Sequence, residues 1–129
     1  IKTGIDELQF KKNFYISIFI TNNLNMKKIN YKYRKKNKIT NVLSFPQNEI
    51  RTLGKSPHII LGDIVISLEK VYEESLEQKK HFYNHLSHMI IHSLLHLFGF
   101  DHDTNKKFEI MKKKEIFILS KMSISSPYK

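Results

Sequence analysis

One short stretch of the sequence decides the fold: it runs His58-Ile59-Ile60-Leu61-Gly62-Asp63-Ile64-Val65-Ile66-Ser67. Its apolar residues do not alternate with polar ones, which is the pattern of a β-strand covered on both faces. We therefore expect this strand to lie inside a sheet that is flanked by helices. The expected class is α+β.

Further elements are predicted on either side of this strand. Aromatic and β-branched residues indicate another strand over residues 13–20, and a short apolar run indicates a third over 42–45, which Pro46 is expected to end. An exposed loop is expected over residues 47–57. Helices are predicted over 24–36, 68–77, 82–98 and 105–120, with Ser67 capping the second and Gly99 ending the third. The result is a single small mixed sheet flanked by helices.

The size and composition limit the architecture. A chain of 129 residues can bury one core but not two, so we expect one domain over residues 1–129, with 123–129 as a loose tail. Without cysteine there are no disulfides and no thiolate metal ligands. The most apolar stretch, residues 89–100, is too short to cross a membrane. The first residues lack the apolar core of a signal peptide, and a cytoplasmic location is expected.

A strong positive charge suggests a polyanionic partner. The formal net charge is +10, from 22 basic and 12 acidic residues, and nucleic acid is the first candidate. AT-rich coding DNA would also enrich lysine, so composition alone leaves both explanations open. Only Arg34 and Arg51 are arginines, which raises the question of what each guanidinium does.

The most informative segment for chemistry is residues 92–102, which spell H-x-x-x-H-x-x-G-x-x-H. His92 and His96, four residues apart, share one face of the predicted helix. A turn at Gly99 would bring His102 back as a third ligand, which leaves one tetrahedral position of a zinc ion open for water. Such a site can lower the pKa of water to about 7. The motif therefore predicts a catalytic zinc site on a helix and turn.

Other histidines at spacings of three or four extend this motif toward the N-terminus of the helix. We interpret His81 and His85 as part of a polar face or a core edge. His88 is open to two interpretations: it orients a ligand through a hydrogen bond, or it only packs.

The spacing also matches that of metzincin proteases, whose second motif position is a glutamate that acts as general base. Here that position is Ser93, which cannot accept a proton at neutral pH. A protease is therefore disfavoured.

Three motifs follow one another along the chain: Tyr33-Arg34 with Thr40-Asn41-Val42-Leu43-Ser44-Phe45-Pro46, then Leu61-Gly62-Asp63-Ile64-Val65-Ile66-Ser67, then His92 to His102. Together they resemble the YbeY family of bacterial endoribonucleases. The resemblance is good over residues 24–102 and weak over 1–23. The chain departs from the family pattern at Ser93, where the family has glycine, and in its polar segment at 47–60.

This resemblance implies a single-strand-specific, zinc-dependent endoribonuclease with one zinc ion per chain. It implies action in 16S ribosomal RNA 3′-end maturation and ribosome biogenesis, with the small ribosomal subunit and its proteins as partners. It also carries the family's important arginine onto Arg34, whose guanidinium can grip a phosphate with two hydrogen bonds. Lys35, Lys36 and Lys38 would extend a positive surface along the RNA backbone.

Several alternatives stay open. The chain could be a non-catalytic zinc-containing ribosome-assembly factor, or a zinc hydrolase of another substrate class. Water and the 2′-hydroxyl of the RNA are both candidate nucleophiles. Asp101 either holds a ligand imidazole or caps the turn, whereas Asp63 is interpreted as structural.

Overall fold

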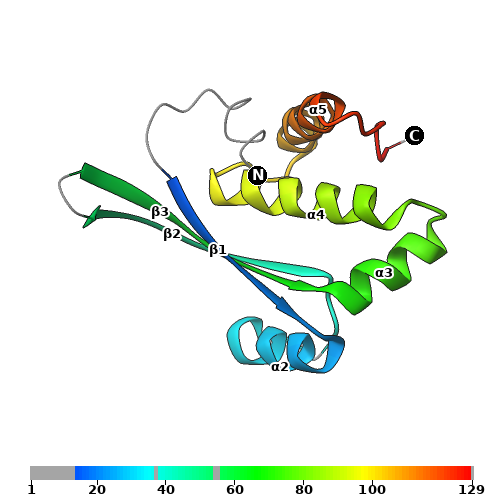
Figure 1. Cartoon of the computed structure of the whole chain (residues 1–129), viewed down its shortest axis with the longest axis horizontal. Coiled ribbons are helices and arrows are strands. Elements are labelled where there is room, and N and C mark those ends of the chain that lie inside the picture. The colour runs from blue at the N-terminus through cyan, green and yellow to red at the C-terminus, as the bar shows by residue number, and fades with distance from the viewer. Residues whose placement is uncertain (1–13, 37, 54–55, 129) are drawn as a thin grey trace.

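The structure, a computed structural model, describes residues 14–36, 38–53 and 56–128. Its centre is a sheet with helix α2 on one face and helices α3 and α4 on the other, while α5 lies on the outer side of α4 (Figure 1). The expected class, α+β with one sheet flanked by helices, is confirmed.

Within the described residues the sheet has three strands: β1 (Phe14–Thr21), β2 (Val42–Leu53) and β3 (Ser56–Ser67). Their order is β1-β3-β2, with β3 in the centre. β1 runs parallel to β3 and β2 runs antiparallel to it, so the sheet is mixed, as expected.

The central strand is buried on both faces. Ile64 and Ile66 pack with Leu94 in a core between the sheet and α4. Val65 points to the opposite face, where it packs against Met26 of α2. Helices on both faces of β3 therefore account for the unbroken apolar run in the sequence.

The sequence prediction was wrong between Pro46 and Pro57. In place of the expected loop, β2 continues to Leu53 and pairs antiparallel with β3, which begins at Ser56; residues 54–55 lie outside the described residues. Pro46 does not end the strand because the register shifts between Pro46 and Glu49, and such an irregularity accommodates a residue without an N–H. The backbones of β2 and β3 approach each other closely at Gly62, where φ is +150° and a Cβ atom would lie 2.2 Å from the carbonyl oxygen of Phe45.

The described helices are close to their predicted ranges: α2 (Asn23–Arg34), α3 (Leu68–Glu77), α4 (Phe82–Leu97) and α5 (Asn105–Lys121). Ser67 caps α3, as expected, by accepting a hydrogen bond from the Lys70 N–H. α2 ends two residues earlier than predicted, because Lys35 adopts a left-handed conformation with φ of 58°. Arg34 is consequently the last helical residue.

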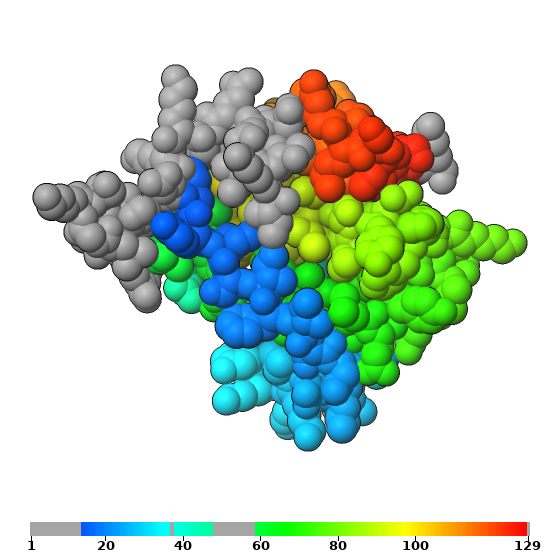
Figure 2. Space-filling view, viewed as in Figure 1, coloured from blue at the N-terminus to red at the C-terminus, as the bar shows by residue number. Residues whose placement is uncertain are grey.

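Residues 123–128, which belong to the segment expected to be a loose tail, contact helices α4 and α5. Ile124 packs against the apolar residues shared by α4 and α5, and its N–H donates to the carbonyl oxygen of Leu119 at 2.9 Å. In the space-filling view the red C-terminal residues lie against α4 (Figure 2).

None of the helices in the described part of the chain is long and apolar enough to span a membrane.

Candidate metal centre

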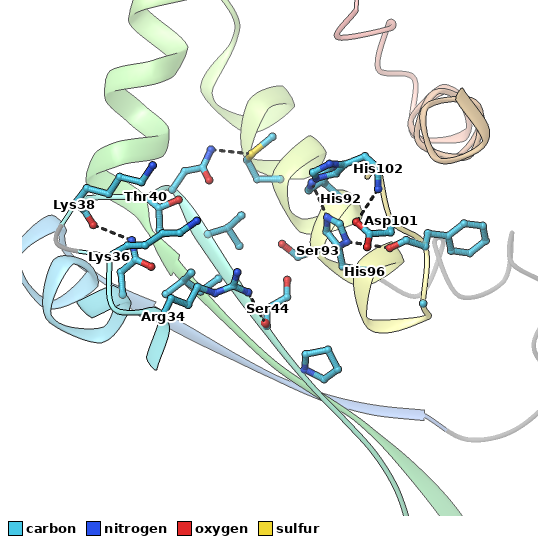
Figure 3. A pocket seen from close by; sticks show the side chains of 18 residues that line it. Arg34, Lys36, Lys38, Thr40, Ser44, His92, Ser93, His96, Asp101 and His102 are labelled. Atoms are coloured by element: carbon cyan, nitrogen blue, oxygen red, sulfur yellow. Dashed lines mark hydrogen bonds between the residues drawn. The ribbon is translucent and has the colours of Figure 1, made fainter. Parts of the chain in front are cut away.

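Three histidines meet where α4 ends. His92 and His96 lie one turn apart on α4, and His102 follows the helix. Gly99, with φ of +98°, ends the helix as predicted, and its N–H donates to the His96 carbonyl oxygen at 3.0 Å. The reversed chain places His102 beside the other two side chains (Figure 3). We call His92, His96 and His102 the histidine cluster.

The geometry of the histidine cluster suits one metal ion. The Nε2 atoms of His92 and His96 are 3.0 Å apart, and one nitrogen of each of the three side chains lies within 4.8 Å of the others. Two nitrogens bound to one tetrahedral zinc ion are about 3.3 Å apart, given Zn–N bonds of about 2.0–2.1 Å. These three residues could therefore hold such an ion with small side-chain adjustments.

The hydrogen bonds made by the Nδ1 atoms of His92 and His96 determine which ring nitrogens are available to bind a metal ion. His92 Nδ1 lies 2.5 Å from Glu115 Oε1, and His96 Nδ1 lies 2.9 Å from the Phe100 carbonyl oxygen. Both partners are acceptors, so each Nδ1 carries the proton and each Nε2 has a free lone pair. Two lone pairs facing each other at 3.0 Å repel unless a cation lies between them. The donor set thus fits a metal ion.

The neutral form of the His96 ring is favoured as well. Burial lowers the pKa of His96, and the neighbouring His92 lowers it further. A neutral imidazole is the form that binds a metal.

Glu115 is the main residue that sequence reasoning missed. It belongs to α5, far from the motif in sequence, and its carboxylate is only 1% exposed. Burial alone raises the pKa of this group, but hydrogen bonds from His88, His92 and Tyr128 outweigh burial and lower it to about 2. The sequence did hold one signal: Glu115 occupies the face of α5 that also carries Met111 and Ile118, where an apolar residue is expected.

His88 is part of the same network. Its Nε2 lies 3.1 Å from Glu115 Oε2, so it contacts the carboxylate that orients His92. His88, His92 and Glu115 are close enough to form a second metal-binding group, but they already bond to one another and share His92 with the histidine cluster. Of the two interpretations from the sequence, the geometry favours an orienting role for His88.

A cavity of about 780 Å³ opens in front of the histidine cluster. The cluster forms one wall, and the end of α2 with the start of β2 forms the other (Figure 3). Arg34, Lys36 and Lys38 line the second wall, whereas Lys35 is not among the lining residues. Among the described residues, the guanidinium of Arg34 makes one long hydrogen bond, from Nη2 to the Ser44 carbonyl oxygen at 3.4 Å.

Asp101 and Ser93 line the cavity, whereas Asp63 lies in the sheet. Asp101 lines the cavity and accepts a hydrogen bond from the His102 N–H at 2.7 Å, which lowers its pKa and makes it a weak base. Asp63 accepts from Gln47 Nε2 at 3.0 Å and bridges two strands. Ser93 also lines the cavity; it is fully buried, and its hydroxyl has no hydrogen-bond partner among the described residues.

The remaining histidines of α4 lie apart from the cavity. His81 caps α4 by accepting from the Tyr83 N–H at 3.3 Å. His85 is buried, and its Nε2 lies 3.0 Å from Glu74 Oε1. These contacts agree with the structural interpretation of both residues.

The histidine cluster beside an open cavity is the arrangement expected of a metal-dependent hydrolase. The model of the YbeY endoribonuclease family matches residues 1–123. The chain therefore belongs to the YbeY family of endoribonucleases.

Individual relatives agree with this assignment. The chain is 45% identical to the endoribonuclease YbeY of Bartonella bacilliformis over 113 residues, which cover 88% of this chain and 71% of the relative. It is 46% identical, over the same shares, to the endoribonuclease YbeY of Bartonella henselae. A Thermotoga maritima protein solved in solution has a similar fold, with a TM-score of 0.58, 23% identity, and coverage of 95% of this chain and 77% of that chain.

Proposed function

We propose that this chain is a single-strand-specific, zinc-dependent endoribonuclease that matures the 3′ end of 16S ribosomal RNA. One observation carries the proposal: the facing Nε2 atoms of His92 and His96 and the guanidinium of Arg34 line opposite walls of the same cavity. A phosphate between these walls would meet a metal ion on one side and a planar cation on the other.

In this proposal His92, His96 and His102 hold one zinc ion per chain. Three imidazole nitrogens without thiolates are a common donor set for catalytic zinc. When bound, zinc polarises a phosphate oxygen or lowers the pKa of a water molecule. Glu115 and the Phe100 carbonyl oxygen keep the two α4 imidazoles in the required tautomer and orientation.

Arg34 acts on the phosphate directly. A guanidinium can donate two parallel hydrogen bonds to phosphate oxygens, and it stabilises charge that develops there during cleavage. Its long bond to the Ser44 carbonyl oxygen costs little to exchange for a phosphate. Arg34 is therefore proposed as the catalytic phosphate-binding residue.

Lys35, Lys36 and Lys38 bind the RNA backbone on either side of the reacting phosphate. Lys36 and Lys38 line the cavity wall, which supports a direct role for them. Lys35 lies in the turn between Arg34 and Lys36, and we assign it a longer-range electrostatic contribution. A flexible single strand can present its phosphate to this cavity more easily than a rigid duplex can.

The biological setting follows from the proposed substrate. We place residues 1–129 in one catalytic domain that works in the cytoplasm on the small ribosomal subunit and its associated proteins. The basic surface would meet a ribosomal RNA strand that these proteins present.

The decisive experiment is single-turnover cleavage of a labelled single-stranded RNA that spans the 16S 3′ end. Protein stripped of metal is compared with the same protein reloaded with one equivalent of zinc. We expect cleavage only after reloading, and no cleavage of the same sequence when it is annealed into a duplex. A peptide library assayed in parallel should stay intact, because the carboxylate that lines the cavity, Asp101, is held by the His102 N–H.

Two other results would replace the proposal. RNA binding without cleavage, even on isolated small subunits, would identify a zinc-containing assembly factor. Zinc-dependent cleavage of peptides or amides with intact RNA would identify a hydrolase of another substrate class.

A further inference from the structure

The C-terminal segment, residues 123–128, is attached to the helices that carry the metal centre. Lys80 Nζ, just before α4, donates a hydrogen bond to the Pro127 carbonyl oxygen at 3.2 Å. The Ser126 hydroxyl accepts from the Tyr128 N–H at 3.2 Å. Together with the packing of Ile124, these contacts place the Tyr128 side chain over α4 and α5.

Tyr128 reaches the buried carboxylate behind the histidine cluster. Its hydroxyl donates a short hydrogen bond to Glu115 Oε2. Its ring lies edge-on to the His88 ring, with centroids 5.6 Å apart. The Lys112 ammonium lies 5.1 Å from the centroid of the Tyr128 ring. Tyr128 itself is 37% exposed, whereas Glu115 is 1% exposed, so the tyrosine lies between the carboxylate and solvent.

The two oxygens of Glu115 have separate partners. Oε2 is bound by both His88 Nε2 and the Tyr128 hydroxyl, and Oε1 is left for His92 Nδ1. Two donors on one oxygen fix the plane of the carboxylate. The direction of Oε1, and with it the rotation of the His92 ring, is thereby fixed as well.

We infer that Tyr128 is a positioning residue of the metal centre: through Glu115, the C-terminal segment holds the His92 imidazole in its metal-binding orientation. Of the three donors to Glu115 that the described residues supply, only Tyr128 comes from outside α4 and α5. Docking of the segment and metal binding are therefore energetically coupled, and the coupling works in both directions. This inference rests on the proposed function, because it takes His92 to be a metal ligand.

The test uses Tyr128→Phe, which removes the hydroxyl and keeps the ring. Zinc affinity and zinc dissociation are measured by competition with a chromophoric chelator. We expect zinc affinity to fall about three- to tenfold through faster dissociation. Residues that hydrogen-bond a ligand histidine typically contribute about 10- to 100-fold to metal affinity, and Tyr128 acts one contact further away. Tyr128→Ala, which also exposes Glu115 to solvent, should lower zinc affinity about tenfold or more. The matched control is Tyr83→Phe, an exposed tyrosine on α4, which should bind zinc like wild type.

A second measurement separates positioning from simple stabilisation. Hydrogen exchange of the backbone amides in residues 123–128 should slow when zinc is added to wild type, and this protection should be weaker in Tyr128→Phe. Unchanged zinc affinity in Tyr128→Phe, or a loss only in the stability of the metal-free protein, would overturn the inference alone. A wild-type protein that binds no zinc would overturn the proposed function and this inference together.

Discussion

The two walls of the cavity are built in opposite ways. On the wall of the histidine cluster, His92 and His96 each have a hydrogen-bonded partner on the outer nitrogen, and the carboxylate that holds His92 is fully buried. On the opposite wall, Arg34 makes a long hydrogen bond to the Ser44 carbonyl oxygen. Within the described part of the chain, Arg34, Lys36 and Lys38 form no ion pair.

This difference indicates when each wall becomes ordered. On the wall of the histidine cluster, which we call the metal wall, the fold itself is expected to order the side chains, because a buried carboxylate without its donors would be costly. On the opposite wall, the basic wall, Arg34, Lys36 and Lys38 are exposed, and under the proposed function these side chains would lose freedom only when RNA binds. A metal site must present its ligands within tenths of an ångström, whereas a surface that tracks a phosphate backbone must follow a variable strand. Substitutions on the two walls should therefore differ in both size and kind.

The largest effect is expected at the centre of the metal wall. His96→Ala should abolish zinc binding and cleavage, because two imidazoles hold zinc poorly. Elemental analysis of purified protein should give about one zinc per wild-type chain and less than about a tenth of that in the variant. The control is His81→Asn, which keeps a side chain that can cap α4. Undiminished zinc in His96→Ala would place the metal elsewhere, for instance at His88, His92 and Glu115.

Glu115→Gln should have the next largest effect. The charge that orients His92 is lost, and the amide group of glutamine cannot accept from all three donors at once. Zinc affinity should fall about 10- to 100-fold in chelator competition. Glu109→Gln, an exposed position on the same helix, should leave affinity unchanged.

The pH dependence of stability gives Glu115→Gln a second readout that needs no metal. The fold lowers the pKa of Glu115 from its ordinary 4.5 to about 2, so the ionised form is favoured in the folded state. This contribution to the free energy of unfolding is present above pH 4.5 and is lost as the pH falls from 4.5 toward 2. Urea unfolding of metal-free protein should show that loss in wild type and lack it in Glu115→Gln. Identical pH profiles would contradict the buried ionised carboxylate.

A different kind of effect is expected on the basic wall. Arg34→Lys keeps the charge but not the planar pair of donors. Zinc content and RNA affinity should stay near wild type, while single-turnover cleavage at saturating protein falls roughly 10- to 100-fold, because the lost contact matters most in the transition state. The control, Lys36→Ala, should weaken binding modestly and leave the cleavage rate of bound RNA nearly unchanged. Wild-type cleavage by Arg34→Lys would remove Arg34 from the catalytic machinery.

The smallest effects are expected for the lysines. They should distinguish Lys36 and Lys38, which line the cavity, from Lys35, which does not. RNA affinity should fall steeply with salt, and Lys36→Ala or Lys38→Ala should each reduce the slope of log affinity against log salt by about 0.7, the value for one phosphate contact on a single strand. Lys35→Ala should change the slope less, because Lys35 does not line the cavity. The comparison is a salt titration of binding for the three variants. A flat wild-type titration would contradict the basic wall as an RNA track.

The sequence by itself determined the parts of this protein that depend on local pattern. The unbroken apolar run of β3 predicted a strand between helices, and the spacing of His92, His96, Gly99 and His102 predicted a cluster, because a helix repeats every 3.6 residues and Gly99 can adopt positive φ. Helix ends at Ser67 and Gly99 followed from their chemistry.

Only the tertiary structure decided which residues from distant segments pair with β2 and contact the histidine cluster. The continuation of β2 past Pro46 depends on pairing with β3, which outweighs the local turn signals at Pro46 and Pro57. Glu115 and Tyr128 come to the side of the histidine cluster because α5 packs on α4 and residues 123–128 fold back on both helices. Local pattern cannot predict such contacts, since the buried carboxylate is stable only after packing has brought its three donors together.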